Sequence, residues 1–170
     1  MTKKLLSPRI LTLALAAFAV ASPVAAQEQG AGEQFAVVTE AGDPETLAAR
    51  AKAQATLPEW LGVLAAQSPD HGGIQFQFAL GGREYIWVEN VAREGDRLTG
   101  TLVMAPVAAE GAKGDRVEVP LAEVTDWAYW TRDERGQGVA HGFHTYEPLF
   151  ADMPPERANE LRRQLGWAER

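Results

Sequence analysis

The first regular pattern of apolar positions in the sequence covers residues 44–66. Apolar residues recur there at three- and four-residue spacing, which is typical of a helix with one buried face. Asp43 is a good N-cap, Pro44 suits the first helical position, and Glu45 is favourable at the positive end of a helix. Pro58 interrupts the pattern, because a proline inside a helix removes one backbone hydrogen bond. The pattern therefore predicts two consecutive helices, or one kinked helix, across 44–66.

After the turn-forming residues 68–73, the period of the apolar positions changes from 3.6 to 2. Gly81-Gly82 is a hairpin signal, and further short apolar segments are separated by turn residues. The predicted strands cover residues 74–80, 84–88, 97–104, 116–119, 124–130 and about 139–146. Because these strands are short and joined by tight turns, the simplest arrangement is an antiparallel meander. The sequence leaves open whether it forms a curled sheet or a partial barrel.

A second helical pattern closes the sequence. Pro154-Pro155-Glu156 opens it, and Gly166 is a suitable C-terminal stop. The predicted fold class is therefore α+β: an N-terminal helix or helix pair, a meander of about five to six short strands, and a C-terminal helix. We expect a single domain over 43–170, preceded by a polar, glycine-rich and flexible segment at 27–42.

The first 26 residues have the pattern of a bacterial secretory signal. A basic stretch that includes Lys3 and Arg9 comes first, an apolar run follows over 10–20, and small residues end at Ala26. We expect cleavage of this signal peptide (1–26) and a mature protein that is periplasmic or secreted. A retained membrane anchor is the alternative, but the apolar run is shorter than the roughly 20 residues that a spanning helix needs.

Charge and cysteine content narrow the classes of partner. The chain has 16 Lys+Arg and 23 Asp+Glu; the first 26 residues hold three of the basic residues and no acid, which leaves a net charge of −10 from Gln27 onward. This acidic balance disfavours nucleic acid and, after signal cleavage, the membrane, because both are bound by neutralising phosphate charge. The chain is cysteine-free, so an exported domain has to be held by its core without disulfides.

Several short blocks of the sequence are distinctive in their order and spacing. The most specific is Val124-Thr125-Asp126-Trp127-Ala128-Tyr129. The others are Ala51–Leu57, Glu84–Val88, Gly100–Leu102 with Pro106, Gly114-Asp115, Val119-Pro120, and the single residues Gly138, Gly142 and Thr145. Together they resemble the YegJ-like bacterial family, a domain of unknown function (DUF2314). The resemblance covers roughly 43–150 and implies a compact domain there. It implies no activity, cofactor or catalytic residue, and similar proteins include exported and cytosolic ones.

The candidate interaction surface consists of Glu84, Trp87, Asp126 and Trp127, because each tryptophan lies in a predicted strand beside an acid. An aromatic and acidic groove of this kind suits a peptide or a small ligand. The alternative is structural: the tryptophans belong to the core, and Asp126 fixes a strand end by accepting backbone N–H groups.

A metal site is a weaker hypothesis. His141-Gly142-Phe143-His144, with Glu147 or Asp152 as a carboxylate, contains ligand types that zinc uses. Residues three apart in a strand face opposite sides, so both histidines would meet one metal ion only if the strand bent at Gly142. We predict no metal and no cofactor.

Nucleophilic catalysis has little support in the sequence. Ser68 is the only serine after residue 26, it precedes a proline in a turn, and no Gly-x-Ser-x-Gly motif occurs. A threonine nucleophile needs a processed N-terminal threonine or an adjacent base, and Gln27 is the expected new terminus. We predict no catalytic residue.

The sequence leaves three candidate functions open. The first is a non-enzymatic periplasmic binding or protein-interaction module, whose partner is a periplasmic protein or a small ligand. The second is an envelope-directed hydrolase that uses carboxylates such as Glu84 and Asp126, which would then share a cleft. The third is a structural scaffold protein.

Overall fold

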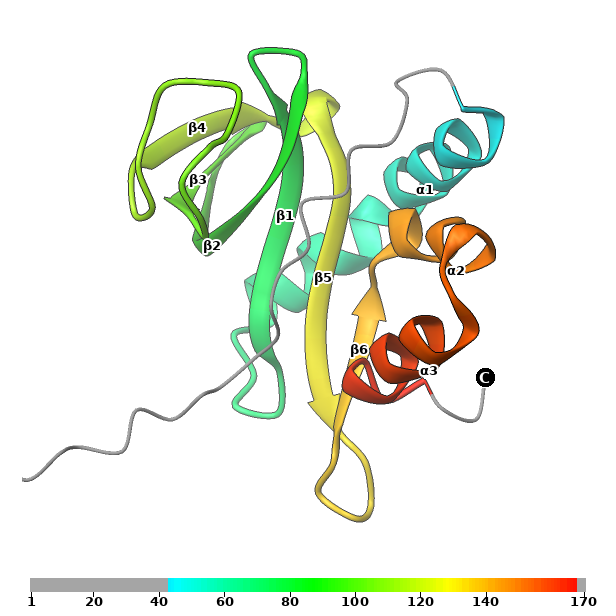
Figure 1. The fold of residues 1–170 in the computed structure, drawn as a ribbon. Coiled ribbons are helices and arrows are strands. Elements are labelled where there is room, and N and C mark those ends of the chain that lie inside the picture. The colour runs from blue at the N-terminus through cyan, green and yellow to red at the C-terminus, as the bar shows by residue number, and fades with distance from the viewer. Residues whose placement is uncertain (1–42, 168–170) are drawn as a thin grey trace, which may run out of the picture. The chain divides into compact units, whose positions relative to one another are not determined.

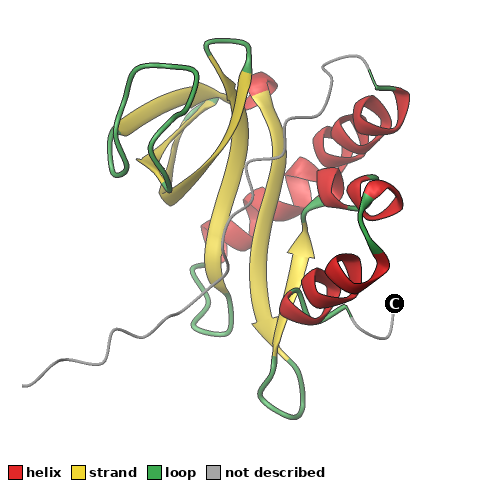
Figure 2. Ribbon diagram, viewed as in Figure 1, coloured by secondary structure: helices red, strands yellow, loops and turns green. Residues whose placement is uncertain are grey.

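The computed structural model describes residues 43–167, so the predicted signal (1–26) and the predicted flexible segment (27–42) lie outside the described residues. Within the described part, one long helix, a six-stranded sheet and short C-terminal helices follow one another (Figures 1 and 2). This order confirms the predicted α+β class. No helix in this part of the chain is long and apolar enough to cross a membrane.

Helix α1 (Pro44–Ala66) is continuous and contains Pro58 in its interior. The Asp43 side chain caps it by accepting the N–H of Thr46 at 2.7 Å. Hydrogen bonds from Thr46 also hold the pKa of Asp43 below its ordinary value, because they favour the ionised carboxylate. Of the two predicted alternatives, the structure has the single helix and not the helix pair. Buried residues on both sides of Pro58 anchor the helix to the sheet, which offsets the lost hydrogen bond.

Six antiparallel strands form one open sheet in the order β4-β3-β2-β1-β5-β6. Their bounds are β1 (Gly72–Leu80), β2 (Glu84–Glu94), β3 (Arg97–Leu102), β4 (Arg116–Pro120), β5 (Val124–Arg132) and β6 (Gly138–Gly142). The strands follow the chain from β1 to β4, and β5 then returns to pair with the other side of β1. β4 and β6 are therefore the two ends of the order, and the sheet does not close into a barrel.

Strand β2 extends well beyond the predicted end at residue 88. Its pairing with β3 shifts register between Glu89 and Ala92, and Asn90 in this interval has a φ of 55°. The irregularity is a bulge, which lets a strand continue after its alternation is broken. The periodicity of the sequence hides such a continuation, because the residues after the bulge are mostly exposed.

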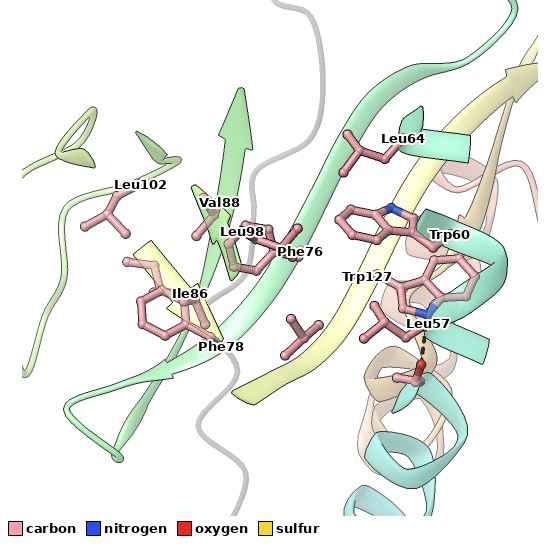
Figure 3. Close-up of a cluster of buried hydrophobic side chains, with 13 residues drawn as sticks. Leu57, Trp60, Leu64, Phe76, Phe78, Ile86, Val88, Leu98, Leu102 and Trp127 are labelled. Atoms are coloured by element: carbon pink, nitrogen blue, oxygen red, sulfur yellow. Dashed lines mark hydrogen bonds between the residues drawn. The ribbon is translucent and has the colours of Figure 1, made fainter. Parts of the chain in front are cut away.

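Two hydrophobic clusters lie on opposite faces of the sheet. Ile86 and Val88 of β2 belong to the cluster under α1, whereas Trp87 between them belongs to the other cluster, because neighbouring residues in a strand point to opposite sides. That second cluster includes residues of the C-terminal helices α2 (Leu149–Asp152) and α3 (Pro155–Gln164). Figure 3 shows the first cluster between α1 and the sheet.

Two indole N–H groups tie α1 to β5 in opposite directions. Trp60 of α1 donates to the carbonyl oxygen of Ala128 at 3.2 Å, and Trp127 of β5 donates to that of Ala53 at 3.0 Å (Figure 3 shows the second bond). An indole has one polar atom, its N–H, and both buried rings thus satisfy it. The pair fixes how the helix lies along the strand.

The last predicted strand, at 139–146, ends early at Gly142. Gly142 has a φ of 80° and Phe143 a φ of 52°, so the chain turns into the 3-10 helix η2 (His144–Tyr146). A Cβ at position 142 would overlap the carbonyl oxygen and the ring of Trp127. Glycine is therefore required there both by its φ and by the close approach of β5.

Helix α3 begins at Pro155, as predicted, and ends at Gln164, two residues before the predicted stop at Gly166. The N–H of Trp167 donates to the carbonyl oxygen of Arg162 at 2.7 Å, and that of Gly166 donates to the carbonyl oxygen of Arg163 at 3.0 Å. This is a Schellman motif, which needs the left-handed conformation that Gly166 adopts at a φ of 69°. The short helix α2 before it was missed, since one turn of helix has too few residues to show a period.

Candidate functional site

The Asp126 carboxylate is the polar centre of the junction between β5 and η2, and it is 0% exposed. Its Oδ1 accepts the backbone N–H of Trp127 at 2.8 Å and of His144 at 3.2 Å. Its Oδ2 accepts the backbone N–H and the hydroxyl of Thr145 at 2.8 and 2.7 Å. The first N–H groups of a helix have no partner within it, so Asp126 caps η2 and joins it to the sheet.

His144 extends this hydrogen-bonded group toward α1. Its Nδ1 lies 3.0 Å from Oδ1 of Asp126, and its Nε2 lies 3.5 Å from the hydroxyl oxygen of Thr56. The half-buried Thr56 hydroxyl also donates to the carbonyl oxygen of Lys52 at 2.8 Å. A hydroxyl, an imidazole and a carboxylate in this series can activate the hydroxyl as a nucleophile. We call Thr56, Asp126, His144 and Thr145 the Asp126 node.

The Asp126 node joins three segments that are far apart in the sequence: α1, β5 and the turn after β6. Thr56, Asp126 and Thr145 each belong to a block that carries the family resemblance. The blocks that were distinctive in the sequence therefore meet at one place. The sequence pointed to Gly142 as a position where a bend would matter, but it gave no signal that connects His144 with Asp126 or Thr56.

The structure separates the residues of the predicted interaction surface. Gln77 of β1 is in register with both Trp87 and Asp126, so these two side chains share one face of the sheet. Trp127 lies on the other face, under α1. Trp87 and Trp127 are only 3% and 6% exposed. This geometry agrees with the structural interpretation, in which the tryptophans are core and Asp126 accepts backbone N–H groups; a binding role for these residues stays a prediction.

Glu84, the fourth predicted residue, is half-buried at the start of β2. Its carboxylate accepts the N–H of Val107 at 2.8 and 3.0 Å and that of Ala108 at 2.8 Å, and so it holds the loop between β3 and β4. Glu84 and Asp126 thus cap separate pieces of backbone. Neither lines the hollows described for residues 43–167.

Tyr146 lies beside Trp87 in the second cluster, with ring centroids 6.2 Å apart. Burial raises the pKa of Tyr146 to about 12, and the charge of Asp126 adds to the increase. The nearby indole N–H of Trp87 has the opposite effect and lowers the pKa of Tyr146 in part. That N–H makes no well-aligned hydrogen bond in the described part of the chain. The phenol is therefore neutral over the physiological pH range.

The two histidines of the metal hypothesis have separate partners. The chain does bend at Gly142, but His141 Nε2 lies 2.8 Å from the Thr131 hydroxyl, while His144 belongs to the Asp126 node. Among the described residues, no group of three or more His, Asp or Glu side chains is placed to hold a metal ion.

A hollow of about 480 Å³, which the sequence did not predict, lies between α1, the β1–β2 turn and the segment where η1 (Leu121–Glu123) leads into β5. It is lined by Arg50, Ala51, Gln54, Ala79, Gly82, Ala122, Glu123, Val124 and Thr125. We call it the Arg50 hollow. The sequence carries no signal for it, because an arginine on an amphipathic helix is typical of a solvated face.

Arg50 is the distinctive side chain of this hollow. Its guanidinium carbon lies 3.8 Å from the centroid of the Tyr85 ring, which holds the group in place. Its Nε is buried and has no hydrogen-bond partner among residues 43–167, and none of the ion pairs found there includes it. A guanidinium of this kind is suited to bind a carboxylate or a phosphate.

The fold defines the class of protein: an α+β domain with an open six-stranded antiparallel sheet and helices on both faces. The sequence model of a family described as "Uncharacterized protein conserved in bacteria (DUF2314)" matches residues 43–168, and the chain belongs to that family. Neither the curated proteins nor the solved structures with which the chain was compared include a match.

Proposed function

We propose that this protein is an exported, non-enzymatic binding module that takes a small ligand in the Arg50 hollow. The observation that carries the proposal is the Arg50 guanidinium, which lines the hollow without an acidic partner in the described part of the chain. A partly buried charge without a partner is costly. A ligand with a negative group would offset this cost, so the hollow favours such ligands.

The Asp126 node supports the non-enzymatic part of the proposal. The carboxylate accepts four hydrogen bonds and also lies 3.0 Å from Nδ1 of His144; two of the four come from the backbone N–H groups of His144 and Thr145, which fix the turn after β6. A group with these bonds stabilises the fold, whereas binding a substrate would require it to give some of them up.

The export part rests on the N-terminal pattern of a basic stretch, an apolar run and small residues up to Ala26. Mass spectrometry of the protein recovered from the periplasm or medium of an expressing bacterium tests it. We expect an N-terminus at Gln27. Full-length protein that stays with the cytoplasmic fraction would contradict export.

Binding is tested by ¹H–¹⁵N NMR titration of the whole protein, as recovered from expressing cells, with a panel of small carboxylates, phosphates, amino acids and sugars. We expect one class to shift the signals of Gly82 and Thr125, and Arg50→Gln to abolish those shifts. Arg135→Gln is the matched control, since Arg135 is exposed in the β5–β6 turn, at the opposite end of β5. A panel without effect, or shifts that persist in Arg50→Gln, would contradict the proposal.

A second candidate function is acyl hydrolysis at Thr56, favoured by the 3.5 and 3.0 Å contacts of the His144 ring with Thr56 and Asp126. The Thr56 oxygen would attack an ester carbonyl carbon while its proton moves to Nε2 of His144. That proton would then leave with the alcohol, and water would release the acid and restore Thr56. The hydroxyl would first have to turn away from Lys52, whose carbonyl oxygen it now meets.

Hydrolysis of p-nitrophenyl esters distinguishes the two candidates. As a binding module, the wild-type protein should match the Thr56→Val variant, in which the hydroxyl is replaced by a methyl group of similar size. Turnover that Thr56→Val removes and Thr56→Ser retains would instead assign the enzymatic function.

A further inference from the structure

Two walls of the Arg50 hollow carry charges of opposite sign. The side-chain amide of Gln54 donates to the carbonyl oxygens of Leu121, at 3.1 Å, and of Val124, and so it ties α1 to η1 and β5. Arg50 lies one helical turn before Gln54, and Glu123 lies between the two residues whose carbonyl groups Gln54 holds. Arg50 and Glu123 therefore line one hollow from two segments that the Gln54 bonds hold together.

Arg50 and Glu123 do not neutralise each other. No ion pair in the described part of the chain includes either residue. Arg50 is held over the Tyr85 ring, and Glu123 is exposed. Two opposite charges that share a hollow without pairing leave room for a molecule that carries both.

We propose that the Arg50 hollow binds a small zwitterion, an α-amino acid or a dipeptide, with its carboxylate at Arg50 and its ammonium group at Glu123. This inference rests on the proposed function and names its ligand class. The planar guanidinium can hold a carboxylate by two parallel hydrogen bonds. An anion without an ammonium group would meet Glu123 at the other wall, and like charges at close range disfavour binding.

The size and lining of the hollow narrow the ligand further. About 480 Å³ lies in the lower part of the range of small-ligand pockets, roughly 300–1,000 Å³. Besides Arg50, Glu123, Gln54 and Thr125, the lining consists of small apolar residues: Ala51, Ala79, Gly82, Ala122 and Val124. The side chains of the ligand should therefore be small and apolar, as in alanine or alanyl-alanine.

Isothermal titration calorimetry of the whole protein with three related compounds tests the ligand class. Alanyl-alanine carries both charges, N-acetyl-alanine lacks the ammonium group, and alaninamide lacks the carboxylate. We expect alanyl-alanine to bind at least tenfold more tightly than either of the others.

Two variants assign the charges. Arg50→Gln should reduce the affinity for alanyl-alanine at least tenfold. Glu123→Gln should make the affinities for alanyl-alanine and N-acetyl-alanine similar, because the carboxylate that attracts the ammonium group of alanyl-alanine is then replaced by a neutral amide. Arg135→Gln and Glu134→Gln, adjacent exposed positions in the β5–β6 turn, are the matched controls and should bind as the wild-type protein does.

The outcomes separate the inference from the function on which it rests. The zwitterionic ligand class is wrong if N-acetyl-alanine binds as tightly as alanyl-alanine. It is also wrong if the NMR panel shifts the signals of the hollow while these three compounds do not bind. In both cases the binding function stands. If no compound perturbs the hollow, both proposals fail.

Discussion

The Asp126 node and the Arg50 hollow both include residues of α1 and β5 and a charged side chain, but the charge has a different environment in each. The Asp126 carboxylate is 0% exposed, accepts four hydrogen bonds and lies 3.0 Å from Nδ1 of His144. The Arg50 guanidinium lines open space, and its Nε has no hydrogen-bond partner in the described part of the chain. A buried charge with every partner supplied belongs to the fold, whereas a charge without partners beside a cavity is available to a ligand.

The two regions also depend on each other. The node secures the turn that follows β6, and the paired indole bonds of Trp60 and Trp127 secure α1 on β5. Because the hollow is built from α1 and the start of β5, its walls are held by these same elements. A ligand site on rigid elements loses less entropy on binding than one on mobile loops.

The largest effect should come from removing the Asp126 carboxylate. Asp126→Ala leaves the buried N–H groups of His144 and Thr145 without an acceptor. We expect the free energy of unfolding to fall by about 3–5 kcal/mol, as for other buried charged groups whose partner is removed. Urea denaturation measures the change. Asp96→Ala, at an exposed position in the β2–β3 turn, is the control, and a loss of less than about 1 kcal/mol for Asp126→Ala would refute the structural role of the node.

Gly142→Ala should have the next largest effect, about 2–3 kcal/mol of lost stability, because it combines an unfavourable φ with overpacking. The added Cβ would overlap the Trp127 carbonyl oxygen and ring. Gly136→Ala isolates the backbone cost, since Gly136 has a similar φ of 76° and open space around it; about 1 kcal/mol is expected there. Equal losses of stability in the two variants would show that the close approach of β5 adds nothing to the cost of Gly142→Ala.

Tyr146 should make stability depend on pH in the alkaline range. Its pKa is raised from 10.0 to about 12 in the folded protein, so the folded state favours the neutral phenol. This contribution is complete below pH 10 and is lost as the pH rises from 10 to 12, by up to about 2–3 kcal/mol. Denaturation curves at pH 8, 10 and 11 test it, and Tyr146→Phe should abolish that part of the pH dependence. An unchanged pH dependence in the variant would assign the effect to other groups.

Arg50→Gln should have the smallest effect on stability and the sharpest effect on binding. It removes a cation–π contact at a partly exposed site, worth about 0.5–1 kcal/mol, and no ion pair. Thermal unfolding should therefore be nearly unchanged while the NMR shifts at the hollow disappear. A loss of stability as large as that of Asp126→Ala would show that Arg50 stabilises the fold. The distinction between a structural charge at Asp126 and a ligand-binding charge at Arg50 would then be wrong.

The predictions from the sequence succeeded where a local pattern carries the information. The start of α1 at Asp43-Pro44, the Gly81-Gly82 turn and the stop at Gly166 all depend on neighbouring residues, and the structure has each of them. Pro58 left one helix and two helices open in the prediction, because the packing that keeps α1 continuous comes from the sheet and not from the helix. The bulge near Asn90 was missed for the same reason, since only pairing with β3 extends β2.

The sequence by itself determined the α+β class, about five to six short antiparallel strands between helices, and the absence of disulfides, but not that β5 returns to pair with β1. It left a binding, a hydrolytic and a structural role open for Asp126. Tertiary structure decided that the sheet stays open, that Trp87 and Asp126 share a face while Trp127 does not, and that His144 joins Asp126 to Thr56. It also decided that Arg50 and Glu123 line the same hollow. Periodicity reports which face of an element is buried, but juxtaposition between elements depends on register, bulges and bends such as Gly142, which no local pattern encodes.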